Sequence, residues 1–243
     1  MTATADLATY RAAWQTKPVL REIYEDFYRR MASACRPGRT LEIGGGSGNF
    51  KAFYPGVVST DIQFSTWLDA VCDAHRLPFA DGAFDNIVMV DVLHHLHRPR
   101  RFLAEASRVL KPAGRLVLVE PAVTPISWLF YRFVHPEWLS MREDPLAEGE
   151  VDPTRDPYDA NQAIPTLMFR GHGPARLKAI FPEFLIRSCR LFSLFAYPMS
   201  GGFRRWSLIP AAAVAPLLRL EAALAPLLGP LMAFRLFAVV ERR

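Results

Sequence analysis

The stretch Leu41-Glu42-Ile43-Gly44-Gly45-Gly46-Ser47-Gly48-Asn49-Phe50 decides the fold of this 243-residue chain. It begins as a short apolar strand, passes through a turn dense in glycine, and continues into a segment that can start a helix. Glycine has no Cβ, so a turn of this composition lets a ligand approach the backbone. Free N–H groups at the start of the following helix then point at that ligand. We therefore expect a nucleotide-like ligand to bind over residues 44–48.

Strand-like and helix-like segments alternate from residue 18 to residue 121. Over residues 18–34, apolar residues recur near the 3.6-residue helical period. This alternation predicts an α/β fold with a doubly wound parallel sheet, in which the carboxyl ends of the strands share one edge. Strands are expected over 40–43, 57–61, 68–72, 84–91, 116–119, 184–195 and 234–240, and helices over 18–34, 99–110 and 174–181.

Acidic residues occur at or just after the ends of these expected strands. Ligands of open α/β sheets bind outside the carboxyl ends of the strands. The convergence of several carboxylates on that edge therefore predicts a binding site more strongly than any single residue does. The acids in question are Glu42, Asp61, Asp73, Asp91 and Glu120.

The spacing of the glycines narrows the choice of ligand. A dinucleotide fingerprint requires G-x-G-x-x-G after the first strand. Here Gly44 and Gly46 supply two of these glycines, but Asn49 stands where the third belongs. A nicotinamide-dependent dehydrogenase is therefore disfavoured, although it remains an alternative. The chain instead carries an acid-x-Gly-x-Gly-x-Gly pattern, which runs from Glu42 to Gly48.

Together with segments further along, this pattern resembles the class I S-adenosylmethionine (SAM) dependent methyltransferases, and among them the methyltransferase type 11-like proteins. The resemblance covers residues 38–121. It implies a Rossmann-like, seven-stranded sheet that is mostly parallel with an antiparallel last strand, and helical insertions on the acceptor side. The segments that carry it are the glycine turn, Ser59-Thr60-Asp61-Ile62, Cys72-Asp73-Ala74, Leu77-Pro78-Phe79, Val92-Leu93-His94-His95-Leu96 and residues 105–114.

The resemblance implies SAM as the cofactor and S-adenosylhomocysteine (SAH) as the product. Asp61 is expected to accept hydrogen bonds from the ribose hydroxyls, and Asp73 to accept one from the adenine amine. Glu42 is expected to interact with the methionine ammonium through backbone or water. The alternative for Asp61 is a helix cap, and for Asp73 a turn residue. No metal site is expected. The full set of expected cofactor contacts is Glu42, Gly44, Gly45, Gly46, Gly48, Asp61, Ile62, Asp73, Ala74, Asp91 and Val92.

Methyl transfer to an alcohol also needs a base for the hydroxyl proton, whereas an enolate or an acidic phenol needs less help. His95 and His94 follow the fourth expected strand, beside the expected methyl position, and either is a candidate. The alternative is that one of them packs as a neutral core residue. Glu120 either lines the acceptor pocket or only ends the fifth strand. His135 and His172 are further candidates.

The chain is read as a single domain made of N-terminal helices (1–37), a SAM-binding core (38–121), a lid insertion (122–172) and a C-terminal part (173–243) with an apolar insertion (198–230). The apolar insertion has three competing interpretations, as a lid over a closed pocket, as a homodimer face, or as a peripheral membrane contact. The expected acceptor is a hydroxyl or carbon of an apolar, lipid-linked or glycan-linked small molecule. The alternative function is a non-catalytic SAM- or SAH-binding module.

Composition excludes several other classes. The net charge of +5 is modest, and the basic residues do not form the run that a nucleic-acid arm would need. Cys35, Cys72 and Cys189 are widely spaced and odd in number, which favours a reducing cytoplasm over a disulfide framework. The uncharged runs Trp206–Leu218 and Ala222–Phe234 are shorter than a bilayer requires and contain prolines, so no transmembrane helix is expected. We expect a cytoplasmic protein, with contact at the inner face of the membrane left open.

Overall fold

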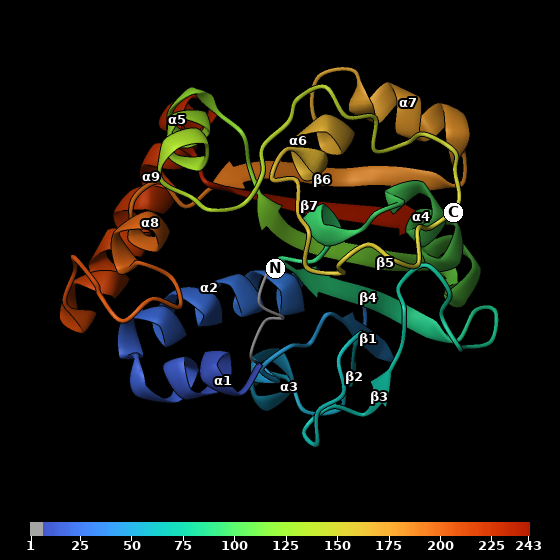
Figure 1. The fold of residues 1–243 in the computed structure, drawn as a ribbon, viewed down its shortest axis with the longest axis horizontal. Helices are drawn as coiled ribbons and strands as arrows, with labels where there is room; N and C mark the ends of the chain where they lie inside the picture. Colours follow the sequence, from blue (N-terminus) through green and yellow to red (C-terminus); the bar gives the residue numbers. More distant parts are fainter. Residues whose placement is uncertain (1–6) are drawn as a thin grey trace.

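A seven-stranded sheet runs through the centre of the molecule in the computed structural model, which describes residues 7–243 (Figure 1). The strand order is β3-β2-β1-β4-β5-β7-β6, and β7 is antiparallel to both of its neighbours while the other pairs are parallel. The expected seven-stranded sheet with an antiparallel last strand is confirmed. The strands are β1 (Thr40–Ile43), β2 (Val58–Asp61), β3 (Ala70–Val71), β4 (Phe84–Val90), β5 (Leu110–Pro121), β6 (Phe184–Phe192) and β7 (Arg235–Arg242).

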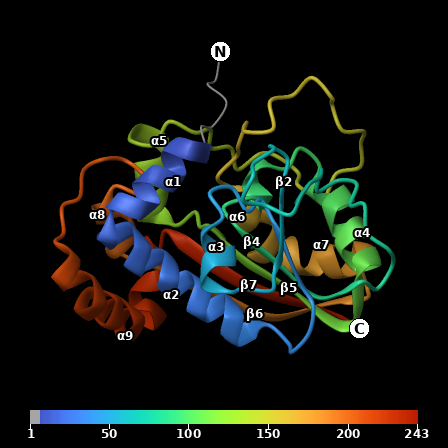
Figure 2. The ribbon, with the colours of Figure 1, turned by 90° about the horizontal axis from the view of Figure 1, so that it is seen from below.

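Helices cover both faces of the sheet (Figures 1 and 2). One face packs against α1 (Leu7–Thr16), α2 (Pro18–Ala34), α3 (Asn49–Phe53), α8 (Ala196–Ser200) and α9 (Val214–Met232). The other face packs against α4 (Pro99–Val109), α6 (Ile164–Phe169) and α7 (Gly173–Ile180). Helix α5 (Pro125–Phe133) contacts α9, and two short 3-10 helices are η1 (Leu93–His95) and η2 (Ala211–Ala213).

The central strands are buried on both sides because their apolar residues alternate between two cores. On β4, Ile87 and Met89 join the core beneath α4 and α6, whereas Val88 joins the core beneath α2. On β5, Leu118 and Val119 divide between the cores in the same way. Side chains of a strand point alternately to its two faces, so the continuous apolar run expected for a covered parallel strand fills both layers at once.

Six of the seven strands differ from their expected bounds, and β3 and β5 are the clearest cases. The strand expected over 68–72 is reduced to Ala70–Val71 at the sheet edge, where it pairs only with β2. The strand expected over 116–119 begins earlier, at Leu110, because Leu110 pairs with Phe84 across an irregularity in the register before regular pairing resumes at Arg115. Ala113 has a left-handed backbone within this bulge. The helix expected over 18–34 has these bounds in the structure.

Helix α9 corrects the expectation that prolines interrupt the apolar insertion. Pro226 and Pro230 lie inside this helix. Each proline removes one N–H bond to the carbonyl four residues earlier, and those carbonyls belong to Ala222 and Pro226, which are exposed. Water can therefore satisfy them. By length and composition alone, the continuous helical stretch Ala211–Met232 could cross a membrane, so the argument from short runs broken by prolines does not hold. The absence of a membrane-spanning helix stays a prediction.

Lys17 fixes the loop that precedes α9. Its ammonium donates to the backbone carbonyls of Ser200 (2.6 Å), Gly202 (2.6 Å), Arg204 (2.7 Å) and Trp206 (2.8 Å). An ammonium has three donors, so the four carbonyls share them. Burial lowers the pKa of Lys17. One side chain at the start of α2 thus orders the backbone of residues 200–206, on which Arg205 and Trp206 are exposed.

Candidate functional site

The glycine turn presses against the turn that follows β4. Gly44, Gly46 and Gly48 all have left-handed backbones, which residues with a Cβ rarely adopt. A Cβ on Gly44 would lie 2.2 Å from the Val92 side chain, so nothing larger than glycine fits there. At Gly46, by contrast, a Cβ would meet no atom closer than 3.9 Å. The turn is therefore tightly packed beneath Gly44 and open beside Gly46, where a ligand can reach the backbone.

Asp61 ends β2 beside this opening. Its carboxylate accepts the Gly46 N–H (2.9 Å) through one oxygen and the Gln63 N–H (2.9 Å) through the other. Burial raises the pKa of Asp61, and these backbone hydrogen bonds lower it. A carboxylate offers about four acceptor positions, so two remain for other donors. That chemistry fits a ribose diol, which brings two hydroxyl donors to one place.

Glu42 lies beneath the turn, between β1 and β2. The Ser59 hydroxyl donates to its carboxylate, which is buried. Burial raises the pKa of Glu42 to about 7, and the nearby Asp61 carboxylate adds to the effect of burial. A cation placed close by would favour the ionised form again. The carboxylate is thus poised for a neighbouring cationic group, as expected for a methionine ammonium.

The expected adenine contacts line the rim next to β3. Asp73 is partly exposed and accepts from the His75 N–H (2.8 Å) and from His75 Nδ1 (2.6 Å). His75 Nε2 in turn accepts the Arg98 N–H at 3.2 Å, which places the imidazole proton on Nδ1. Ala74 is buried and Ile62 is exposed. Asp73 thus keeps its other oxygen for an external amine.

A second cluster lies at the ends of β4 and β5, and Glu120 is its centre. The Glu120 side chain is fully buried. One oxygen accepts the N–H groups of Val92 (2.9 Å) and Leu93 (2.7 Å), and the other lies 2.7 Å from His94 Nδ1. Glu120 therefore both ends the fifth strand and holds the turn that carries the two histidines.

His94 is a buried cation held between two carboxylates. Its Nδ1 contacts Glu120, and its Nε2 lies 3.7 Å from a carboxylate oxygen of Glu137. Burial alone would lower the pKa of His94, but the two carboxylates raise it to about 10. Burial likewise opposes ionisation of Glu137, yet the charged His94 lowers the pKa of Glu137 to about 2. Gln162 also donates its amide to Glu137.

His95 has the opposite protonation state. Its Nδ1 lies 3.1 Å from the Tyr158 carbonyl oxygen. Because a carbonyl oxygen can only accept a hydrogen bond, Nδ1 carries the proton of the neutral ring and Nε2 keeps a free lone pair. Burial lowers the pKa of His95 to about 4, and the charged His94 ring, 4.2 Å away between centroids, acts in the same direction. At neutral pH, the His94 ring is therefore charged and the His95 ring is neutral.

Comparison with known proteins agrees with this geometry. Residues 41–118 match the family model described as "Methyltransferase domain". This segment is a class I methyltransferase domain.

Two curated relatives match longer stretches of the chain. The demethylmenaquinone methyltransferase of Beutenbergia cavernae is 32% identical over an alignment of 143 residues that covers 53% of this chain and 58% of that protein. A ubiquinone/menaquinone biosynthesis C-methyltransferase of Bordetella parapertussis is 36% identical over an alignment of 138 residues that covers 45% of this chain and 53% of that protein. The chain thus spans between about half and three-fifths of the length of these two relatives.

The fold matches more of the chain than the sequence does. A SAM-dependent methyltransferase from Archaeoglobus fulgidus superposes with a TM-score of 0.51, covering 95% of this chain and 96% of that structure at 17% sequence identity. At this level of identity the likeness concerns the fold alone. It includes the regions outside residues 41–118, where sequence patterns were least informative.

Within this fold, the Asp91 carboxylate forms an ion pair with Arg235. The Arg235 guanidinium, which is buried at the start of β7, donates to both Asp91 oxygens, and the Tyr24 hydroxyl donates at 3.1 Å. The Arg235 guanidinium also stacks over the Tyr197 ring at 4.0 Å. Asp91 has a left-handed backbone. A cofactor contact by Asp91 stays a prediction, and any such contact would share the carboxylate with Arg235.

Of the two remaining histidine candidates, His135 lies near the cluster and His172 does not. The His135 Nδ1 accepts the Glu137 N–H at 3.3 Å, and burial lowers the pKa of His135. His172 is exposed at the start of α7 and does not join the cluster. Arg235 and Glu137 were not anticipated. Glu137 lies in an insertion without a regular pattern, and only its place beside His135 marks it in the sequence.

Helix α1 covers the glycine turn, which no sequence pattern indicated. The Trp67 indole donates to the Gly46 carbonyl at 2.9 Å, and Arg11 donates to the Ser47 carbonyl at 3.0 Å. The Arg11 guanidinium also stacks over the Trp67 ring at 4.5 Å. These contacts place an aromatic ring and a cation at the mouth of the expected cofactor site.

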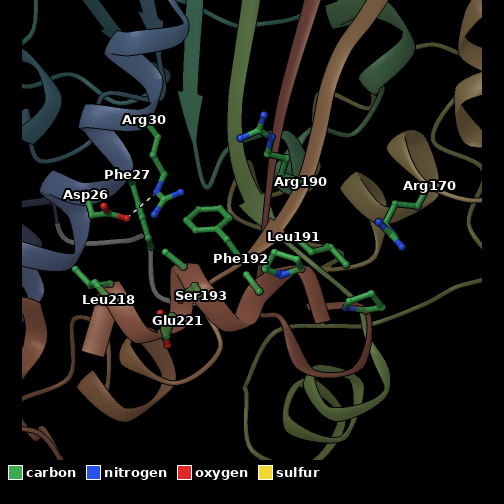
Figure 3. Close-up of a pocket in the computed structure, with 14 residues that line it drawn as sticks. Asp26, Phe27, Arg30, Arg170, Arg190, Leu191, Phe192, Ser193, Leu218 and Glu221 are labelled. Atoms are coloured by element: carbon green, nitrogen blue, oxygen red, sulfur yellow. Dashed lines mark hydrogen bonds and ion pairs between the residues drawn. The ribbon is translucent and has the colours of Figure 1, made fainter. Parts of the chain in front are cut away.

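A separate cavity of about 430 Å³ lies between α2, β6 and α9 (Figure 3). Phe27, Phe192 and Leu218 line its apolar side, and Arg30 and Arg190 line its polar side. Strand β6 is at the edge of the sheet, four places from β1. With neighbouring strands about 4.8 Å apart, the cavity is roughly 19 Å from the glycine turn. It is therefore distinct from the expected cofactor site.

The protonation of His94 predicts a pH dependence of stability. A pKa raised to about 10 in the folded state, against about 6.5 when unfolded, adds stability that is fully present below pH 6.5 and is lost as the pH rises towards 10. Glu137, with its lowered pKa, adds stability that is lost only in strong acid. We expect urea denaturation to show a larger loss of unfolding free energy between pH 6 and pH 9.5 in the wild type than in His94→Gln. Equal pH slopes would contradict the buried cation.

Proposed function

We propose that this chain transfers the methyl group of SAM to an oxygen or carbon of an apolar small molecule and releases SAH. The observation that carries this proposal is the pairing of an open glycine turn beside Asp61 with a histidine pair of opposite protonation at the adjacent strand ends. The methyltransferase domain supports the choice of cofactor. The relatives are named for quinone methylation, which supports a small-molecule acceptor.

The residues of the glycine turn would hold the cofactor. SAM, when bound, supplies a methyl group on a positively charged sulfur. A nucleophile can take this methyl group, and the sulfur then leaves as part of SAH. Asp61 would accept the ribose hydroxyls, Asp73 and Ala74 would receive the adenine, and Glu42 would stabilise the ammonium. Gly44 to Gly48 bring the backbone close enough for contact.

His95 is the candidate base for the acceptor. Its Nε2 lone pair is free, because Nδ1 donates its proton to Tyr158. A base with a pKa near 4 removes a proton poorly from an alkyl alcohol but adequately from an acidic phenol or enol. His94 cannot serve as a base at neutral pH because it is already charged. This difference favours an aromatic or enolic acceptor among the apolar molecules that the sequence suggested.

Residues 135–162 support the proposed lid over the acceptor. The Asn161 N–H donates to the His94 carbonyl at 2.9 Å, and Tyr158 holds His95. The insertion therefore closes on the histidine pair through direct hydrogen bonds. A closed site excludes water, which would otherwise compete for protons and weaken electrostatic interactions.

A non-catalytic SAM- or SAH-binding module is the alternative. It would need the glycine turn and Asp61, but it would not need a neutral His95 beside a charged His94. Release of SAH in the presence of an acceptor separates the two functions. A dehydrogenase would instead bind NADH without binding SAH in calorimetry.

Removal of the Asp61 carboxylate should weaken cofactor binding. In Asp61→Ala, two charge-assisted hydrogen bonds to ribose are lost, and at about 1.5 kcal/mol each the affinity for SAH should fall roughly 100-fold. Isothermal calorimetry measures this directly. Asp81→Ala is the matched control, because Asp81 is an exposed acid paired with Arg108. An unchanged SAH affinity in Asp61→Ala would sink the assignment of the cofactor site.

Replacement of the base should affect turnover rather than cofactor binding. We expect His95→Gln to lower kcat/KM for the acceptor about 100-fold or more, as loss of general-base catalysis does, while SAH affinity stays the same. The wild-type rate should rise with pH as His95 loses its proton near pH 4, and this acidic limb should be absent in the variant. His172→Gln serves as the control. Wild-type turnover in His95→Gln would exclude His95 as the base.

A further inference from the structure

The outward face of α9 has the wrong character for a water-exposed helix. A surface helix normally turns its polar residues to solvent. On α9 the exposed residues at helical spacing are Pro216, Leu220, Ala223, Leu227 and Leu231. Leu227 is 78% exposed, more than either Leu220 or Leu231. The apolar stripe of this helix therefore points away from the core of the protein.

Helix α5 and the loop before α9 continue this apolar surface. Helices α5 and α9 contact each other and lie at the same end of the molecule in both ribbon views (Figures 1 and 2). On α5, Ile126, Leu129 and Phe133 are exposed at helical spacing. We call the combined surface the α5–α9 face. Its exposed large apolar residues are Ile126, Trp128, Leu129, Phe133, Trp206, Leu208, Leu220, Leu227 and Leu231.

The exposed charges of the two segments that form the α5–α9 face are all of one sign. The exposed charged residues of segments 122–136 and 198–234 are Arg132, Arg204, Arg205 and Arg219. The only acid in these two segments is Glu221, which is buried and accepts the backbone N–H of Ala196 at 2.6 Å. A large apolar surface with a basic rim matches a bilayer that carries anionic headgroups.

We propose that the α5–α9 face docks this protein onto an anionic lipid bilayer. The two tryptophans, Trp128 and Trp206, suit the boundary between headgroups and acyl chains, where indole rings concentrate. Lys17 orders the loop that presents Trp206, so this residue is held in place before any membrane contact. The proposal goes beyond methyl transfer and does not depend on it.

The packing of α9 indicates that the helix lies on the membrane and does not cross it. Val214, Glu221 and Gly229 on its inner side are buried against the domain. If α9 left the domain to span a bilayer, the Glu221 carboxylate would lose the N–H groups of Phe195 and Ala196 and enter lipid. An ionisable group at the centre of a bilayer is costly. The observed packing therefore favours an interfacial orientation.

A second copy of the chain fits the same surface less well. In a twofold dimer the same patch occurs on both subunits, so the four arginines of one copy would face those of the other. Like charges brought together across an interface oppose association. Anionic lipid, by contrast, complements all four arginines at once.

The surface also borders the cluster formed by Glu120, His94, His95 and Glu137. Helix α5 is followed directly by His135 and Glu137, and α9 is followed directly by Arg235. The Tyr131 hydroxyl on α5 donates to the Phe234 carbonyl at 2.9 Å, which joins the two connections. If the proposed function holds, an apolar acceptor dissolved in the bilayer would lie next to the lid. This supply of acceptor from the bilayer rests on the proposed function, whereas the docking itself does not.

Vesicle co-sedimentation of the full chain tests the proposal. We expect binding to vesicles of phosphatidylcholine with phosphatidylglycerol, much weaker binding to phosphatidylcholine alone, and a loss of binding at high salt. Leu227→Glu should weaken binding roughly tenfold or more, because it removes an exposed leucine that would enter the bilayer and adds a negative charge. Arg219→Glu should weaken it at least fivefold, since each basic contact contributes about that factor.

Matched controls lie at the other end of the sheet. Phe64→Glu changes a side chain that is also 78% exposed, and Arg76→Glu changes an exposed arginine near β3. Both should bind vesicles like the wild type, and circular dichroism checks that all four variants fold.

Three results would overturn the proposal. They are no vesicle binding by the wild type, equal losses in Leu227→Glu and Phe64→Glu, or a dimer that Leu227→Glu dissociates without any vesicle binding. Calorimetry with SAH on the same samples keeps the two proposals separate. Loss of SAH binding would concern the function and leave the membrane result intact.

Discussion

The carboxylate of Glu120 is the constraint on which the site depends. It is fully buried, and it has three nitrogen partners, the N–H groups of Val92 and Leu93 and the Nδ1 of His94. A buried carboxylate without donors would be strongly destabilising. The chain therefore folds the turn after β4 around this one group. The same turn presses Val92 against Gly44, so the shape of the glycine turn follows from the position of Glu120.

The different protonation states of the two histidines follow from the same contact. Glu120 and Glu137 keep His94 charged, and that charge helps to keep its neighbour His95 neutral. The charged His94 ring thus lies beside His95, whose unprotonated Nε2 can accept a proton. Residues 135–162 are attached to this arrangement by hydrogen bonds from the Asn161 N–H and to the Tyr158 carbonyl, and the pair Asp91–Arg235 joins the end of β4 to the start of β7. The geometry of the candidate acceptor site is therefore set by residues from four separate segments of the chain.

Sequence patterns predicted the elements whose signals are local. The apolar run of Ile87 to Val90, the glycines at 44, 46 and 48, and the acid of Asp61 all depend on neighbours within a few residues, and the structure places them as expected. Contacts between distant residues were not predictable in this way. Arg235 reaches Asp91 across 144 positions, and no spacing rule connects them. Glu137 and Trp67 were not predictable either, because they lie in irregular segments without a periodic pattern.

Periodicity also leaves the direction of an apolar face undetermined. Ile126, Leu129 and Phe133 recur at helical spacing and lie on helix α5, yet these residues face outward and not towards the core. On α9, Pro226 and Pro230 suggested an interrupted segment, but the exposed carbonyls that they leave unpaired can bond to water. Which face is buried depends on the partners of the helix, and those are supplied by the tertiary fold.

The most direct test of this account is an NMR titration of the His94 and His95 ring resonances in the wild type and in Glu120→Gln. The account predicts that at pH 8 the wild type has a protonated His94 and a neutral His95, and that Glu120→Gln lowers the pKa of His94 towards its ordinary value. Two histidines that titrate together near pH 6.5 in the wild type, or an unchanged His94 in Glu120→Gln, would contradict it.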